Sequence, residues 1–132
     1  MRRHAEGLLT DVCWQNSSSG GDDRLIYGVS SMQGWRISME DAHATILDLQ
    51  PLDKNGKPAN AAGAEQRISF FGVYDGHGGD RVALFTGDNL HQIIAKQEAF
   101  KKGDYEQALK DGFLATDQAI LKGLAIPENS AA

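Results

Sequence analysis

Residues 68–79 read Ile-Ser-Phe-Phe-Gly-Val-Tyr-Asp-Gly-His-Gly-Gly. The first seven are mostly apolar on both alternating faces, which is typical of a strand covered on each side by another layer. A glycine-rich turn follows at once, and apolar residues then recur at helical spacing from about 79 to 97. The sequence therefore predicts a central buried strand that ends in a sharp turn and leads into a helix.

Strands precede helices along the rest of the chain. Residues 25–31 and 41–49 alternate as strands do. A second helix is expected to begin at Asp104, with Gln107 completing a capping box, and to end near Gly123. This order predicts an α+β fold with three strands followed by two helices.

Composition limits the class of protein. The chain has 132 residues and a net charge of −5, so it suits one soluble domain and is an unlikely nucleic-acid binder. No apolar run is long enough to cross a membrane, and no secretory signal is visible at the start of the chain. A single cysteine, Cys13, fits a reducing compartment, and we expect a cytoplasmic or nuclear protein or both. Residues 1–23 are largely polar and are expected to form a flexible leader.

The turn after the central strand carries groups suited to catalysis. Asp75 offers a hard oxygen ligand for Mg²⁺ or Mn²⁺, and Gly76 leaves its carbonyl accessible to an ion. His77 carries an imidazole, the side chain that most often serves as a general acid or base. The alternative is a plain strand-to-helix turn, in which Asp75 caps the helix and His77 belongs to the turn. A dinucleotide-binding loop is disfavoured because Arg81 stands where its third glycine would be.

A second charged segment precedes the strand at 41–49. Arg36 is followed by the adjacent carboxylates Glu40 and Asp41. Neighbouring strand residues point to opposite faces, so these two carboxylates converge on one atom only if the backbone bends. Taken alone, the segment is also explained as a charged strand end on the surface.

Together, Arg36-x-x-Met39-Glu40-Asp41 and the run Phe71-Gly72-Val73-Tyr74-Asp75-Gly76-His77-Gly78-Gly79 resemble motifs of the metal-dependent protein phosphatases of type 2C, the PPM family. The resemblance runs from about Arg24 to Leu121 and is strongest to fungal members. It implies a four-layer sandwich, with two sheets between pairs of helices and two Mg²⁺ or Mn²⁺ ions at one end.

The resemblance also implies a role for each residue. Asp75 would bridge the two ions, the carbonyl of Gly76 would bind one of them, and Glu40 and Asp41 would hold metal-bound water. Arg36 would bind the substrate phosphate, and His77 would protonate the leaving oxygen. The implied activity is hydrolysis of phosphoserine and phosphothreonine in protein substrates by metal-activated water.

Members of this family are longer and supply further aspartates from a later segment. We therefore expect residues 24–132 to form the amino-terminal part of the domain, an incomplete half of the sandwich. The alternative to an enzyme is a non-catalytic fragment or binding module that lacks the later ligands. Exposed strand edges of such a half would allow self-association.

Overall fold

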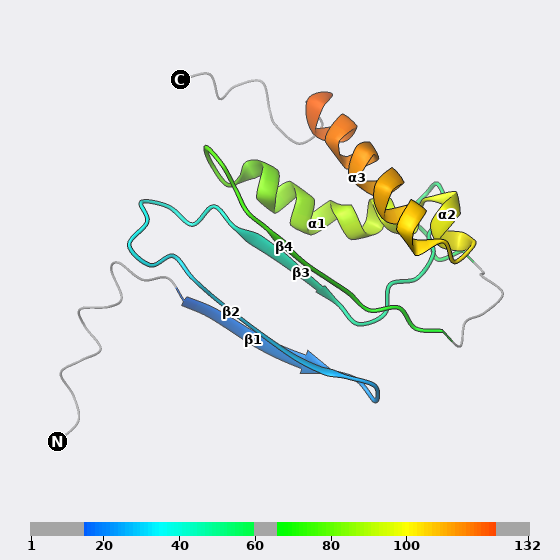
Figure 1. Cartoon of the computed structure of the whole chain (residues 1–132), viewed down its shortest axis with the longest axis horizontal. Coiled ribbons are helices and arrows are strands. Elements are labelled where there is room, and N and C mark those ends of the chain that lie inside the picture. Colours follow the sequence, from blue (N-terminus) through cyan, green and yellow to red (C-terminus); the bar gives the residue numbers. More distant parts are fainter. Residues whose placement is uncertain (1–14, 60–65, 124–132) are drawn as a thin grey trace. The chain divides into compact units, whose positions relative to one another are not determined.

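The computed structural model describes residues 15–59 and 66–123. The chain divides into two compact units, residues 1–39 and 40–132. The described elements are strands and helices in the order expected of an α+β protein, with all strands before the helices (Figure 1). No described helix is both long enough and apolar enough to span a membrane.

The first unit contains a β-hairpin. Strand β1, Gln15–Gly21, pairs antiparallel with β2, Ile26–Met32, in a register that runs from Gln15 opposite Met32 to Gly21 opposite Ile26. The expectation of a flexible leader is thus wrong for β1, and residues 1–14 lie outside the described part. The polar sequence of β1 shows no alternation of apolar residues and so gives no local indication of a strand. The strand is instead formed by backbone hydrogen bonds with β2.

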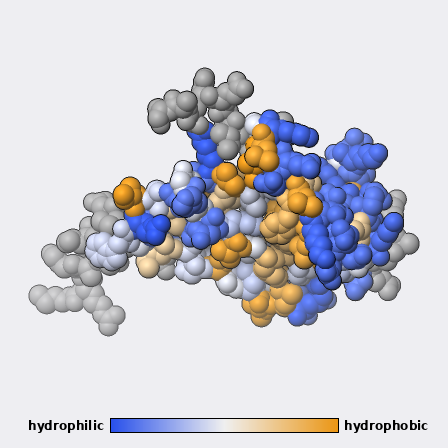
Figure 2. Space-filling view, turned by 45° about the horizontal axis from the view of Figure 1, so that its top comes forward, coloured by the Kyte–Doolittle hydropathy of each residue, from blue (hydrophilic) through white to orange (hydrophobic). Residues whose placement is uncertain are grey.

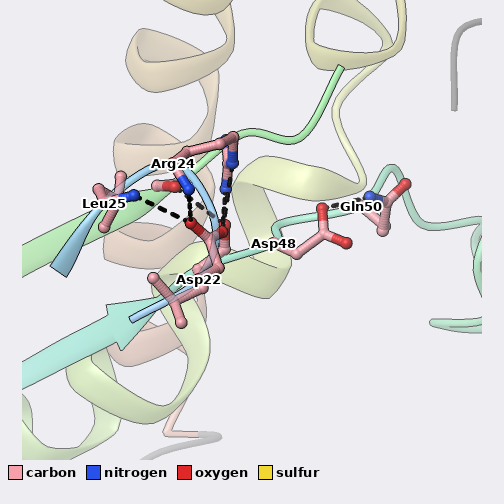
Figure 3. Close-up of polar contacts among 7 residues, drawn as sticks. Asp22, Arg24, Leu25, Asp48 and Gln50 are labelled. Carbon is pink, nitrogen blue, oxygen red and sulfur yellow. Dashed lines mark hydrogen bonds and ion pairs between the residues drawn. The ribbon is translucent and has the colours of Figure 1, made fainter. Parts of the chain in front are cut away.

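Asp22 organises the turn of this hairpin. Its carboxylate accepts backbone N–H bonds from Arg24 at 2.8 Å and Leu25 at 3.1 Å. The Arg24 guanidinium adds an ion pair of 2.6 Å (Figure 3). These donors favour the charged carboxylate and lower its pKa from 3.8 to about 2, the side-chain bond from Arg24 contributing most.

We expect Arg24→Gln to raise the pKa of Asp22 from about 2 toward 3.8. Because the pKa is depressed in the folded state, this carboxylate stabilises the hairpin above pH 3.8 and loses that effect as the pH falls through about 2. An NMR titration of the Asp22 carboxyl carbon measures the midpoint, with Arg36→Gln as the matched control. A midpoint near 3.8 in the unmodified chain would contradict this assignment.

The second unit is a two-stranded sheet with helices on one face (Figure 1). Strand β3, Ala42–Ile46, pairs antiparallel with β4, Phe70–Tyr74. Helix α1 spans Arg81–Ala95, the short α2 spans Glu98–Lys101 and α3 spans Tyr105–Leu121. The expected strands and both longer helices are present, with shorter strands than predicted, whereas α2 was not anticipated.

Within the second unit, the helices cover one face of this sheet and leave the other uncovered (Figure 1). On β4, Phe70 and Tyr74 pack toward the helices, while Phe71 and Val73 are 47% and 81% exposed. Within this unit the strand is therefore covered on one side, and cover on its other side stays a prediction. Its apolar pattern is real, but the helices cover only one of its two faces.

The core of the second unit lies between the sheet and the helices. Its buried residues come from the segment that follows β3 and from all three helices: Leu49, Leu90, Ile94, Ala95, Phe100 and Ala108. Asp104 caps α3 as predicted, because its carboxylate accepts the backbone N–H of Gln107 at 3.1 Å. The Gln107 side chain instead donates to Asp111 at 2.8 Å, so the reciprocal half of the capping box is not formed.

Two helical glycines allow the layers to approach closely. A methyl group on Gly87 would lie 3.3 Å from Cβ of Ala42, so α1 sits almost on the backbone of β3. A methyl group on Gly112 would lie 3.2 Å from Cα of Ile94, between α1 and α3. Each glycine costs about 1 kcal/mol of helix stability relative to alanine, and the close packing offsets that cost.

Candidate metal centre

Strand pairing brings the two predicted motifs to one end of the second sheet. Ala42 and Tyr74 form the last pair of the ladder between β3 and β4. Asp41 directly precedes Ala42 in the chain, and Asp75 directly follows Tyr74. In an antiparallel pair these two flanking residues therefore emerge at the same end. Carboxylates that are far apart in sequence thus become neighbours through the register.

Gly76 makes the direct connection between the motifs. Its backbone N–H donates to Oδ1 of Asp41 at 3.3 Å, although the two residues are 35 positions apart in the chain. A Cβ on Gly76 would collide with the carbonyl oxygen of Glu40 and lie 2.8 Å from its carbonyl carbon. Only glycine lets the two backbones meet this closely, so the second motif needs Gly76 for packing as well as for its carbonyl.

The turn after Gly76 redirects the chain into α1. Gly78 and Gly79 have φ values of 71° and 130°, which residues with a side chain rarely adopt. The N-cap of α1 is Asp80, whose side chain makes no capping bond. The interpretation of Asp75 as a helix cap is therefore wrong. Asp75 and His77 are both exposed at the end of the sheet.

Tyr74 is the last residue of β4 and directly precedes this turn. No role for it was predicted from the sequence. Its hydroxyl is buried and, among the described residues, has no hydrogen-bond partner. Burial raises the pKa of the phenol, which keeps it neutral. The ring lies over Gly72, where any side chain would collide with it. The alternation of β4 would have placed Tyr74 on the helix-facing side, but nothing in the sequence indicated an unpaired hydroxyl.

The donor chemistry at this end of the sheet suits a hard divalent cation only in part. Glu40, Asp41 and Asp75 offer carboxylate oxygens, the ligands that Mg²⁺ and Mn²⁺ prefer. Within residues 15–59 and 66–123, however, no three His, Cys, Asp or Glu side chains converge as a metal-holding group. These residues can therefore supply part of a shell of about six oxygens.

Arg36 belongs to the first unit. It lies in an exposed bend after β2, and its carbonyl accepts a bond from the Gln33 side chain at 2.8 Å. Its guanidinium is thus accessible, and its place beside the phosphate stays a prediction. The same holds for the roles assigned to Glu40, Asp41, Asp75, Gly76 and His77.

Comparison with known proteins agrees with the two motifs. The family model described as protein phosphatase 2C matches residues 25–131. The chain belongs to the protein phosphatase 2C family. This confirms the resemblance inferred from the motifs, and members of the family are hydrolases.

Fungal phosphatases are among the relatives of this 2C-family chain. It is 66% identical over 108 residues to protein phosphatase 2C homolog 2 of Aspergillus fumigatus, covering 80% of this chain and 24% of the relative. It is 49% identical over 122 residues to protein phosphatase 2C homolog 2 of Schizosaccharomyces pombe, covering 92% and 30%. The chain thus spans about a quarter of the length of the first of these relatives.

Proposed function

We propose that this chain contributes to a metal-dependent protein serine/threonine phosphatase that hydrolyses phosphoserine and phosphothreonine in protein substrates. Membership of the 2C family supports phosphatase activity. One structural observation supports the site: the Gly76 N–H bonds to Asp41, and the Gly76 backbone packs against that of Glu40. This contact joins both motifs at one end of the β3–β4 sheet.

Each residue of the proposed site has a distinct task. Asp75 and the Gly76 carbonyl would hold Mg²⁺ or Mn²⁺, with Glu40 and Asp41 beside them. The bound ions would supply positive charge that lowers the pKa of water and offsets the charge of the phosphate. The Arg36 guanidinium would bind the phosphate oxygens through its planar fork of N–H donors.

His77 would act at the other side of the phosphate. Its exposed imidazole, as the imidazolium, would donate a proton to the seryl or threonyl oxygen as the phosphorus–oxygen bond breaks. An alkoxide is a poor leaving group without that proton. The need for His77 should therefore depend on the leaving group of the substrate.

A chimera tests this proposal, in which the present chain replaces the matching segment of the Aspergillus fumigatus relative. We expect the chimera to hydrolyse a phosphothreonine peptide and to lose that activity in EDTA. His77→Gln should lower kcat for the peptide about 10²–10⁴-fold, as expected for loss of a general acid. The loss for p-nitrophenyl phosphate should be much smaller, because p-nitrophenolate leaves without a proton.

The chimera that keeps His77 is the matched control for both substrates. An equal loss of kcat on the two substrates would show that His77 is not the general acid. A chimera with no phosphatase activity would count against the proposed function, provided that the unmodified relative is active in the same assay.

A further inference from the structure

Five lysines gather at the end of the second unit that carries α2. Lys54 and Lys57 belong to the loop at residues 53–58, while Lys96, Lys101 and Lys102 surround the end of α1 and the short α2. We call these five residues the lysine platform. Figure 2 shows hydrophilic residues covering this end of the unit. The whole chain has a net charge of −5, so the platform contrasts in sign with the protein.

A backbone hydrogen bond joins the residue before the loop at 53–58 to the end of α1. Leu52 donates its backbone N–H to the carbonyl of Ala95, the last residue of α1, at 2.9 Å. The Lys96 side chain passes over the loop, with Nζ 3.8 Å from where a Cβ on Gly56 would stand. Lysines that are some 40 positions apart in sequence therefore share one surface.

The loop itself is held in a defined shape. The Asp53 carboxylate accepts the backbone N–H groups of Asn55 and Lys57, each at 2.8 Å. The Gly56 N–H donates to the Asp53 carbonyl at 3.0 Å, and Leu52 forms a β-bridge with Pro58. These bonds occupy the Asp53 carboxylate with backbone amides and order the loop before any partner arrives. A preformed surface loses less entropy on binding than a flexible one.

The positive charge of the lysine platform is only partly neutralised by neighbouring carboxylates. Within the described residues, only Lys101 of the five lysines forms an ion pair, with Glu98 at 2.7 Å. The pKa of Glu98 is lowered chiefly by the hydrogen bond and charge of Lys101, and also by Lys102 and Lys54. Charges from both segments thus act on one exposed carboxylate. Lys54, Lys57, Lys96 and Lys102 are exposed to solvent.

We propose that the lysine platform binds an acidic peptide segment of a protein partner. Carboxylates spaced along an extended peptide would complement lysines spread over a rigid surface. A nucleic acid fits less well, because the net charge of −5 would repel a long phosphate backbone.

The platform is separate from the candidate metal centre. The turn at residues 75–80 precedes α1, and the platform lies at the other end of this 15-residue helix. A helix of that length spans about 22 Å. A peptide bound at the platform would therefore leave the metal centre free. The proposal does not depend on phosphatase activity, since its test measures binding alone.

The test uses a fluorescein-labelled peptide of six glutamates alternating with glycine, titrated with the 132-residue chain at low salt. The variant K54Q/K96Q removes two exposed lysines of the platform. We expect about fivefold weaker binding by fluorescence anisotropy, because each exposed charge pair contributes only a few tenths of a kcal/mol to about one. Binding should also weaken as salt screens the charges.

The matched control is K110Q/K122Q, which removes the same charge from α3 and its end. It should change the affinity less than about twofold. Equal weakening by both variants, or no binding by the unmodified chain, would overturn the proposal. Circular dichroism checks that each variant keeps its secondary structure.

Two further measurements decide where the peptide binds and what kind of ligand the platform takes. NMR amide shifts in the unmodified chain should change within residues 51–58 and 95–103 when peptide is added, and changes confined to other residues would overturn the proposal. Tighter platform-dependent binding to oligothymidylate or to vesicles with phosphatidylserine than to the peptide would overturn the choice of an acidic peptide.

Discussion

Replacing Asp75 with asparagine in the chimera should lower kcat/KM for a phosphothreonine peptide by about 10³-fold or more. The amide is almost the same size as the carboxylate but carries no charge and is a weaker ligand for a hard cation. A bound metal would stabilise the charge of the transition state, so its loss should raise the activation free energy by several kcal/mol. Each 1.36 kcal/mol changes the rate tenfold.

The expected loss is measured by steady-state kinetics over a range of Mn²⁺ concentrations. Asp117→Asn is the matched control, because Asp117 is exposed on α3 and lies outside both motifs. The kcat/KM of the control should stay within about twofold of that of the unmodified chimera, because an exposed substitution away from the site usually has little effect. If saturating Mn²⁺ restored the kcat/KM of the Asp75→Asn variant to within tenfold of the unmodified chimera, Asp75 would not be an essential ligand.

Gly76→Ala should lower the free energy of unfolding of the second unit by about 3 kcal/mol, at the upper end of what overpacking costs. The added Cβ would collide with the carbonyl oxygen of Glu40 and lie 2.8 Å from its carbonyl carbon. Both partners in this contact are backbone, so neither can swing aside as a flexible side chain would. Relief requires the ends of β3 and β4 to separate, which would also stretch the bond from the Gly76 N–H to Asp41.

Urea unfolding of the 132-residue chain measures the effect, with Gly78→Ala as the control. A Cβ on Gly78 meets nothing within 4 Å, so its cost is the strain of a φ of 71°. That strain amounts to about 1–2 kcal/mol. A smaller loss of stability in Gly76→Ala than in Gly78→Ala would mean that the strand ends part easily and that the close contact is not required.

Periodicity located most of the regular elements, because it reports on local geometry. The alternation at residues 25–31 and the apolar run at 68–74 correspond to β2 and β4, and the cap at Asp104 marks the start of α3. The signal failed at β1, whose serine and glycine residues resemble a linker. There the strand depends on hydrogen bonds to β2, and no pattern within the segment itself reports them.

The candidate site shows the same distinction between what local sequence predicts and what pairing of distant segments decides. The order and spacing of the residues around Arg36 and Asp75 were enough to show the resemblance to the family, because a motif is a property of the sequence alone. Their adjacency is different: Gly76 meets Asp41 across 35 positions only because β3 and β4 pair in one register. The lysine platform likewise requires the loop at 53–58 to dock on the end of α1. Contacts of this kind depend on how distant segments pack, and packing is a property of the whole folded unit that no local pattern records.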